Sequence, residues 1–146
     1  MVPALTKAKE GANRAKCANN LRQIGLAGIQ YADNTRAYPY ANGDMNATLA
    51  ILRKEGYLDL DGAALGCPSN PGGASYDGFK APYPNSTRSS TLIAWDLTPH
   101  SGRKGEVVRN VMFADCTVQT VNAAEFERLL AEHDALVEKI LAKQPR

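Results

Sequence analysis

The sequence predicts a single α+β domain, and three observations lead to this fold class. Apolar residues recur at helical spacing over residues 4–32 and again over residues 122–146. Three short runs within residues 91–121 are rich in β-branched and aromatic residues, as strands are. Helices at the two ends of a chain, with strands grouped between them, are typical of helices packed on an antiparallel sheet. We therefore expect residues 1–146 to form one domain.

Composition agrees with an ordinary folded domain and excludes several protein classes. The chain is 44% hydrophobic and 22% charged, which excludes a disordered or collagen-like chain. Its net charge is only +2, so we expect no nucleic-acid partner. A membrane-spanning helix needs about 20 consecutive apolar residues, and the sequence contains no such run.

The first predicted helix, residues 4–32, changes character along its length. Its N-terminal half presents small alanines, whereas the part from Leu21 to Tyr31 presents bulkier side chains. We expect only the second half to pack on a core and the first half to project. The segment before Gln23 carries five basic residues and one acidic residue, a net charge of +4. The expected apolar stripe consists of Leu5, Ala8, Ala12, Ala15, Ala18, Leu21, Ile24, Gly28 and Tyr31.

Residues 33–90 form a turn-rich region. A short helix is expected over residues 48–55, because apolar residues recur there at helical spacing and Gly56 is placed to end it. Turn-forming residues are so dense over residues 59–90 that we expect loops without regular structure. A loop of this length needs to be fixed to the domain, and Cys67 is the obvious candidate.

The strand candidates of the sheet span residues 91–95, 107–114 and 117–121. The last two are expected to form a hairpin through a two-residue turn, Asp115 and Cys116. Both residues of such a turn need positive φ, which glycine adopts without steric cost. Cys116 at this position is therefore expected to cost roughly 1 kcal/mol.

The C-terminal helix, residues 122–146, has a clear start signal. Asn122 is placed to accept a hydrogen bond from a free backbone amide, and Glu125 is placed to reach back to it in a capping box. His133 lies on the apolar stripe, where we expect it at the boundary between core and solvent. The stripe consists of Phe126, Leu129, Leu130, His133, Val137, Ile140 and Leu141.

One set of residues has the composition of a catalytic site. His100 and Asp115 would supply a general base and the residue that orients it. The nucleophile would be one of the three cysteines, Cys17, Cys67 and Cys116. The sequence shows no glycine-rich turn or nucleophile elbow that would stabilise an oxyanion. We therefore expect no enzyme and no cofactor, with His100 fixing the long loop by a hydrogen bond and Asp115 accepting amides of its turn.

The segment from Cys17 to Gly25, CANNLRQIG, is more particular than a helix requires. Together with residues 3–10 before it and residues 31–39 after it, this segment resembles bacterial type IV pilin-like pseudopilins. The similar branch carries a prepilin-processing-associated H-x9-DG domain. The first forty residues are the most specific part of the resemblance.

Later segments extend the resemblance over residues 2–121. Residues 67–69 match the family's CPS element, residues 90–96 match the strand before the family histidine, and residues 110–115 match its strand and turn NVLFADG. The residues that the family motifs place in structural roles are Asn19, Asn20, Gln23, His100, Asn110 and Asp115.

Three departures separate the chain from the family pattern. Fourteen residues lie between His100 and Asp115, where the family has nine, and Cys116 replaces the turn glycine. Residues 123–146 extend beyond the usual end, which predicts an extra C-terminal helix. The family's processing site and membrane-embedded half helix do not occur in the sequence, so we expect this portion to follow a membrane segment in the full-length protein.

The resemblance implies a type IV pilin-like fold, in which a long N-terminal helix packs on an antiparallel sheet. It implies a non-enzymatic pseudopilin subunit of a type II secretion pseudopilus or a type IV pilus-like filament for protein export. Its partners would be other pseudopilins, in homo- and hetero-oligomers. Prepilin peptidase and the inner-membrane assembly platform would act through the membrane segment. The full-length protein would cross the bacterial inner membrane once, with this portion periplasmic or extracytoplasmic.

Two expectations about site residues rest on the resemblance. An extracytoplasmic setting would permit a disulfide between Cys17 and Cys67, and a closed loop of about 50 residues would stabilise the fold by ~4 kcal/mol. Two buried thiols are the alternative. Some major pseudopilins bind calcium in their C-terminal loops, which makes Asp96 and Asp115 calcium candidates, although no EF-hand spacing surrounds them.

The residues also permit a second class of function. Residues 59–90 would act as a binding or adhesion module that recognises a glycan or an exoprotein, with Tyr76 and Tyr83 in contact with the ligand. The basic residues from Lys7 to Arg22 flank an apolar stripe without interleaved aromatic residues. We therefore expect a solvated or partner-facing side of the helix there, and no nucleic-acid or lipid site.

Overall fold

The computed structural model of the chain describes residues 3–59, 75–102 and 104–143, with side chains from residue 7 onward. Its helices are α1 (Pro3–Thr35), α2 (Met45–Lys54) and α3 (Ala123–Ala142). Its strands are β1 (Tyr76–Gly78), β2 (Leu92–Asp96), β3 (His100–Ser101), β4 (Val107–Phe113) and β5 (Val118–Asn122).

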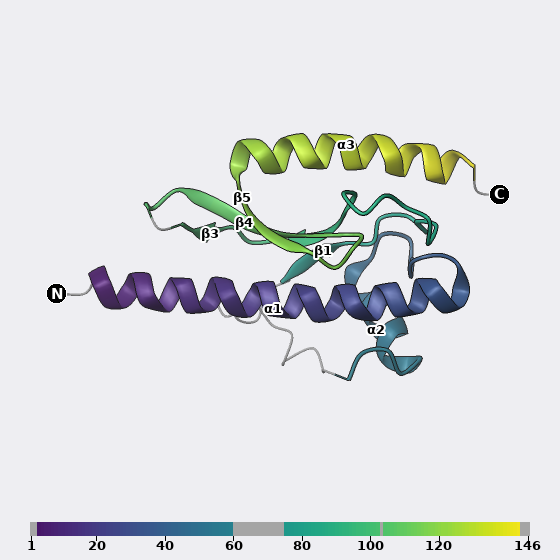
Figure 1. The fold of residues 1–146 in the computed structure, drawn as a ribbon, viewed down its shortest axis with the longest axis horizontal. Coiled ribbons are helices and arrows are strands. Elements are labelled where there is room, and N and C mark those ends of the chain that lie inside the picture. The colour runs from purple at the N-terminus through teal and green to yellow at the C-terminus, as the bar shows by residue number, and fades with distance from the viewer. Residues whose placement is uncertain (1–2, 60–74, 103, 144–146) are drawn as a thin grey trace.

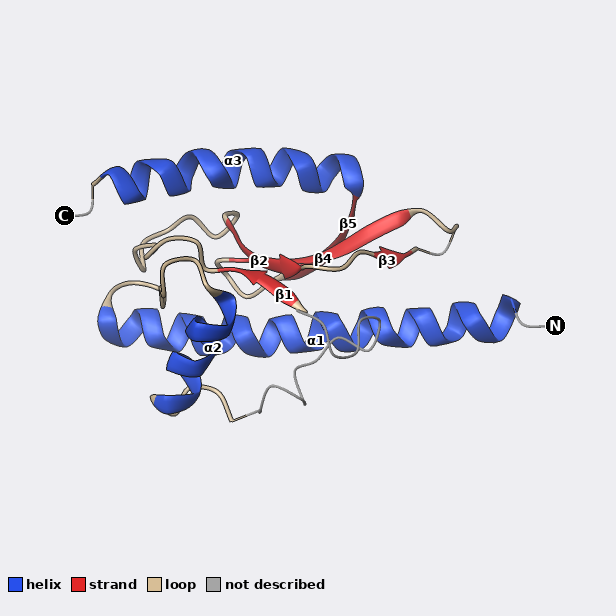
Figure 2. Ribbon diagram, turned by 180° about the vertical axis from the view of Figure 1, so that it is seen from behind, coloured by secondary structure: helices blue, strands red, loops and turns tan. Residues whose placement is uncertain are grey.

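The sheet lies between the two long helices (Figure 1). α1 runs along one face of the sheet and α3 along the other, and the short helix α2 packs against α1 (Figure 2). This architecture confirms the predicted α+β class and the type IV pilin-like fold, with an extra C-terminal helix. None of the described helices is long and apolar enough to cross a membrane.

All strand pairs in the described part of the chain are antiparallel. The order is β1-β2-β4-β3, and β5 also pairs with β4. β4 is therefore the central strand: the second half of β4 pairs with β2, the first half pairs with β3, and nearly its whole length pairs with β5. The three predicted strands are confirmed as β2, β4 and β5, each within one residue of its expected bounds.

Two short strands were not predicted. β1 lies within residues 59–90, where the expectation of loops without regular structure is wrong at residues 76–78. Gly78 permits the close approach of β1 to β2, because a Cβ atom at this position would lie 2.4 Å from the backbone oxygen of Ile93. Strands of two or three residues are too short for alternating hydrophobicity to reveal them.

Apolar residues of the sheet alternate between the two helix layers. On the α1 side, Ile93 and Met112 join the cluster that contains Leu21. On the α3 side, Trp95 packs edge to face on Phe126, with the ring centroids 6.0 Å apart. The C-terminal helix therefore has its own apolar contact with the sheet, which adds stabilisation beyond α1 packing.

Burial along α1 does not follow a single stripe. Ala8, Ala12 and Ala15 are exposed, and Leu26, on the same side of the helix, has 54% of its surface exposed. From Ala15 to Ile24 the residues of the predicted stripe are spaced by three, and each such step rotates about 60° less than a full turn of the helix. Three of these steps place Ile24 on the side of α1 opposite to Ala15. The core packing predicted for Leu21 to Tyr31 is confirmed, but burial of α1 begins four residues earlier, at Cys17. We call Ala8, Ala12, Ala15 and Leu26 the exposed stripe.

The starts of α2 and α3 depend on side-chain caps. Asp44 Oδ1 accepts a hydrogen bond from the Ala47 amide at 3.1 Å, so α2 begins three residues earlier than predicted. Asn122 caps α3 as predicted, because its Oδ1 accepts from the Glu125 amide at 2.8 Å. The Glu125 carboxylate binds the guanidinium of Arg128 instead of reaching back to the cap, which completes only half of the expected capping box.

The hairpin between β4 and β5 differs from the predicted two-residue turn. Among its turn residues only Cys116 has positive φ, at +69°. The Cys116 amide donates to the Phe113 oxygen at 3.0 Å, and the Phe113 amide donates to the Thr117 oxygen at 2.9 Å. The connection is therefore a three-residue loop that ends in one left-handed residue, a geometry that usually contains glycine.

His133 is buried, and the prediction of a boundary position is wrong. The loop before β2 covers it: the Tyr83 hydroxyl lies 2.5 Å from His133 Nε2, and the ring of Trp95 meets the imidazole edge to face. Nδ1 of His133 lies 3.0 Å from Asp134 Oδ1 at the surface. Burial lowers the pKa of His133 below its ordinary value.

Candidate functional site

Five buried polar side chains connect α1 to the sheet. Cys17 and Asn20 come from α1, Asp96 ends β2, His100 begins β3, and Asn110 lies in β4. Their exposed fractions lie between 0% and 6%. Buried polar groups need hydrogen-bond or ionic partners to offset the loss of water, so their contacts decide what this cluster does. We call these five residues the junction cluster.

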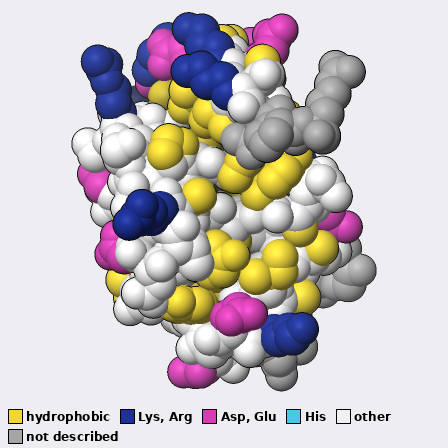
Figure 3. Space-filling model, turned by 90° about the vertical axis from the view of Figure 1, so that its right-hand side faces the viewer, with side chains coloured by type: hydrophobic (Ala, Val, Ile, Leu, Met, Phe, Trp, Pro, Cys, Tyr) yellow, Lys and Arg dark blue, Asp and Glu magenta, His cyan; other side chains and the backbone are white. Residues whose placement is uncertain are grey.

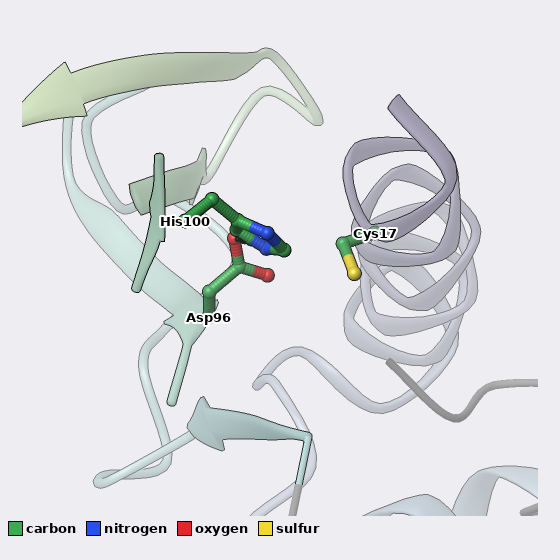
Figure 4. Close-up of side chains that lie close together, drawn as sticks. All are labelled: Cys17, Asp96 and His100. Carbon is green, nitrogen blue, oxygen red and sulfur yellow. Dashed lines mark ion pairs between the residues drawn. The ribbon is translucent and has the colours of Figure 1, made fainter. Parts of the chain in front are cut away.

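Asp96 is the centre of the junction cluster. Its Oδ2 lies 3.0 Å from His100 Nε2 and accepts a hydrogen bond from the Asn110 backbone amide at 2.9 Å. Cys17 points from α1 toward this pair (Figure 4). The Cys17 sulfur, a carboxylate oxygen of Asp96 and a ring nitrogen of His100 all lie within 4.8 Å of one another. Among the described residues, this is the group of side chains that could hold a metal ion.

The Asn110 side chain joins three elements. Its Nδ2 donates to the backbone oxygen of Arg14 in α1 at 2.9 Å. Its Oδ1 accepts from the Thr120 hydroxyl of β5 at 2.8 Å. Because the Asn110 amide also binds Asp96, this residue fixes α1, β2 and β5 relative to one another.

Two further contacts attach the short strands to α1. Asn20 Nδ2 donates to the Tyr76 hydroxyl of β1 at 3.0 Å. Arg14 donates through Nη1 to the Ser101 oxygen of β3 at 2.6 Å. Burial raises the pKa of Tyr76 far above its ordinary value, so its hydroxyl stays protonated.

The other residues of the family motifs lie outside the junction cluster. Asn19 and Gln23 are exposed on α1, and Asn19 Oδ1 accepts from Arg22 Nη1 at 2.9 Å. Asp115 lies in the hairpin turn, where its Oδ1 accepts from the Thr117 amide at 2.9 Å, as predicted. Hydrogen bonds from Thr117 hold the pKa of Asp115 below its ordinary value.

The comparisons with known proteins give one match. Residues 6–58 match the family model described as "Protein of unknown function (DUF1559)". This family is associated with pilin-like, prepilin-type proteins. The match covers most of α1 and all of α2, includes Cys17 and Asn20, and ends before the sheet. No curated protein and no solved structure matches the chain.

The structure separates the two calcium candidates. Asp96 is the last residue of β2, whereas the turn with Asp115 follows Phe113, which pairs with Leu92 at the first residue of β2. The two carboxylates therefore belong to opposite ends of the strand, about 13 Å apart along it. His100, which the catalytic hypothesis paired with Asp115, is paired with Asp96 instead.

The catalytic hypothesis named three cysteines as candidate nucleophiles, and Cys17 and Cys116 are the two among the described residues. Cys67 lies outside the described residues, so its disulfide with Cys17 stays a prediction. Cys116 is half-buried in the hairpin, and burial raises the pKa of its thiol. A raised pKa leaves less thiolate at neutral pH, which does not favour a nucleophile.

The tyrosines assigned to the binding-module hypothesis are not available to a ligand. Tyr76 and Tyr83 are buried, with exposed fractions of 5% and 0%. Hydrophobic side chains at the end of the molecule where α1 and α3 finish form several patches separated by polar surface (Figure 3). Among the described residues, a groove of about 580 Å³ lined in part by Leu97, Leu130 and Leu141 is one surface that could hold a ligand.

The sequence patterns did not predict that Asp96 and Cys17 lie next to His100. One signal was present: Asp96 directly follows an apolar strand and precedes His100 by four residues. A carboxylate at the end of a fully buried strand needs a partner, and a nearby histidine can supply it. The approach of Cys17 could not be read in this way, because it depends on how α1 lies on the sheet.

Proposed function

We propose that this chain is the extracytoplasmic portion of a non-enzymatic pilin-like subunit. The subunit would assemble into a type II secretion pseudopilus or a type IV pilus-like filament that exports protein. The pilin-like fold and the family match over residues 6–58 support the pilin-like assignment. The exposed stripe of α1 is the observation that supports assembly.

The exposed stripe has the properties of a helix-packing face. Ala8, Ala15 and Leu26 are seven and eleven residues apart, about two and three helical turns, so they share one side of α1. This side points away from the sheet, because the buried residues of α1 lie on the opposite side. Small side chains let a second helix approach closely. The stripe spans about 27 Å of helix, enough to contact the α1 helices of neighbouring copies.

The proposal assigns partners to separate parts of the protein. Other pseudopilins, identical and related, would pack against the exposed stripe. A membrane segment before this portion would hold the full-length protein in the bacterial inner membrane, pass through the assembly platform and be processed by prepilin peptidase. No nucleic acid, cofactor or catalytic step has a role in this proposal.

Cross-linking in cells that express the full-length protein tests the assembly face. Ala12→Cys places a thiol in the exposed stripe, and a short bismaleimide should link neighbouring copies into dimers and longer ladders. Ala135→Cys is the matched control, because Ala135 is also an exposed helical alanine but lies on the outer side of α3. The parent chain measures the background from its own cysteines.

Equal cross-linking of the two variants would contradict the proposal, and so would an absence of Ala12→Cys ladders in cells that form filaments. Binding of a glycan or an exoprotein without ladders and without the secretion ATPase would instead favour the binding module.

A further inference from the structure

Cys17, Asp96 and His100 form a set of donors that no role in assembly requires. They come from α1, β2 and β3, and their ligand atoms lie within 4.8 Å of one another (Figure 4). Each side chain is more than nine-tenths buried. Thiol, carboxyl and imidazole groups so close together in the interior are unusual, because each would be better solvated at the surface.

The described contacts around Asp96 satisfy one of its two carboxylate oxygens and leave the other without a hydrogen bond. Asp96 Oδ2 is bound by His100 Nε2 and the Asn110 amide, but the other oxygen, Oδ1, is buried without a hydrogen-bond partner among the described residues. A buried carboxylate oxygen without a partner is costly, and such atoms are uncommon in native proteins. A cation bound next to Asp96 would supply the missing partner.

We propose that Cys17, Asp96 and His100 bind one Zn²⁺ ion. Zinc accepts thiolate, imidazole and carboxylate ligands, and sites with three protein ligands and a water are common. The sulfur donor argues against calcium, which takes oxygen ligands. A thiolate and a carboxylate together balance the charge of the ion, which suits a buried site.

The surroundings of the three donors fit a metal site. The Asn110 amide holds the Asp96 carboxylate, as residues around a metal often hold its ligands. Asn110 is held in turn by Arg14 O and Thr120, so its position is fixed by α1 and β5. Because the ligands come from the helix and two strands, a bound zinc ion would join α1 to the sheet at the point where burial of α1 begins.

Metal titration of the purified chain tests the proposal. After treatment with a chelator and its removal, we expect one zinc ion per chain by competition with a chromophoric zinc indicator, and a rise in Tm on zinc addition. Cobalt in place of zinc should give a thiolate-to-cobalt charge-transfer band, which reports a cysteine ligand without any substitution.

Substitutions locate the ion. Cys17→Ser and His100→Gln should each weaken zinc affinity by at least about a hundredfold. Asn110→Ala keeps the backbone amide that binds Asp96 but removes the side-chain bonds to Arg14 and Thr120 that fix the position of this amide, so it should weaken zinc affinity by about tenfold. Cys116→Ser and His133→Gln are matched controls, since each removes the same residue type outside the set, and both should bind zinc as the wild type does. Circular dichroism checks that each variant folds.

Four results would overturn the proposal. The first is an absence of zinc binding at micromolar concentration by the folded wild-type chain. The second is unchanged affinity in folded Cys17→Ser and His100→Gln, which would place the ion elsewhere. The third is a wild-type cobalt complex without the charge-transfer band. The fourth is a peptide-mass map that shows Cys17 in a disulfide in the native protein. None of these results depends on filament assembly.

Discussion

His133 is a buried base whose surroundings suit its neutral form. Its Nε2 meets the Tyr83 hydroxyl and its Nδ1 meets Asp134, so a neutral ring can accept on one nitrogen and donate on the other. Burial lowers its pKa below the ordinary value of 6.5. Below this pH the unfolded chain binds a proton at this residue that the folded chain does not yet bind. The free energy of unfolding therefore falls as the pH falls through 6.5.

Substitution of His133 should flatten this pH dependence. We expect the wild type to lose more stability than His133→Gln between about pH 7.5 and about pH 5, measured by urea unfolding at each pH. All other titratable residues are the same in the two proteins, so the difference between them reports His133. Parallel pH profiles would mean that His133 is protonated equally well in the folded and unfolded chain.

At the scale of single residues, prediction from sequence succeeds where the hydrogen-bond partners of a residue lie close to it along the chain. The Asn122 cap, the hydrogen bond of Asp115 in its turn and the positive φ of Cys116 all depend on residues at most three positions away. The junction cluster depends on contacts such as Asn110 to Arg14, 96 residues apart. No local rule connects such residues, and this is why the approach of Cys17 to Asp96 and the burial of His133 beneath Tyr83 were not predicted.

Substitution of Gly11 and of Gly78 by alanine should change the stability of the chain in opposite directions, because one lies in a helix and the other in a strand. Gly11 lies in α1 with open space where a side chain would go, whereas Gly78 in β1 has φ of +145° and would place a methyl group 2.4 and 2.6 Å from backbone atoms of β2. We expect Gly11→Ala to stabilise the chain by about 0.5–1 kcal/mol through higher helix propensity. We expect Gly78→Ala to destabilise it by about 2 kcal/mol or more, since β1 must move away from β2.

Denaturant unfolding of both variants measures these opposite effects. A neutral Gly78→Ala substitution would show that β1 is not held against β2 in solution. Gly11→Ala serves as the control for the same chemical change at an unhindered position. A loss of stability in that variant would indicate that the N-terminal half of α1 contacts something at this position.

The hydrophobic periodicity of the sequence predicted the long helices and strands correctly, but it predicted the wrong face for the first half of α1. Both long helices and β2, β4 and β5 are confirmed, because each is long enough for its pattern to repeat. The stripe on α1 was wrong in its first half, since steps of three residues rotate around the helix. α2 began earlier than its apolar pattern because Asp44, a polar residue outside that pattern, sets its start.

At the scale of the whole molecule, the two long helices lie on opposite faces of one sheet (Figure 1). The exposed stripe points away from the sheet on the α1 side, and Ala135 points away from it on the α3 side. If the exposed stripe packs into the centre of a filament, then α3 has to face the outside. The net charge of +4 before Gln23 would lie at the inner, membrane-proximal end.

Thiol labelling of assembled filaments tests this orientation. A maleimide carrying a polyethylene glycol chain should modify Ala135→Cys at nearly the same rate in filaments as in the isolated chain, because α3 stays exposed to solvent. The same reagent should modify Ala12→Cys readily in the isolated chain and at least about tenfold more slowly in filaments, since neighbouring helices would cover the exposed stripe. Protection of Ala135→Cys with continued labelling of Ala12→Cys would reverse the orientation and place α3, the helix that extends beyond the family pattern, at the contact between subunits.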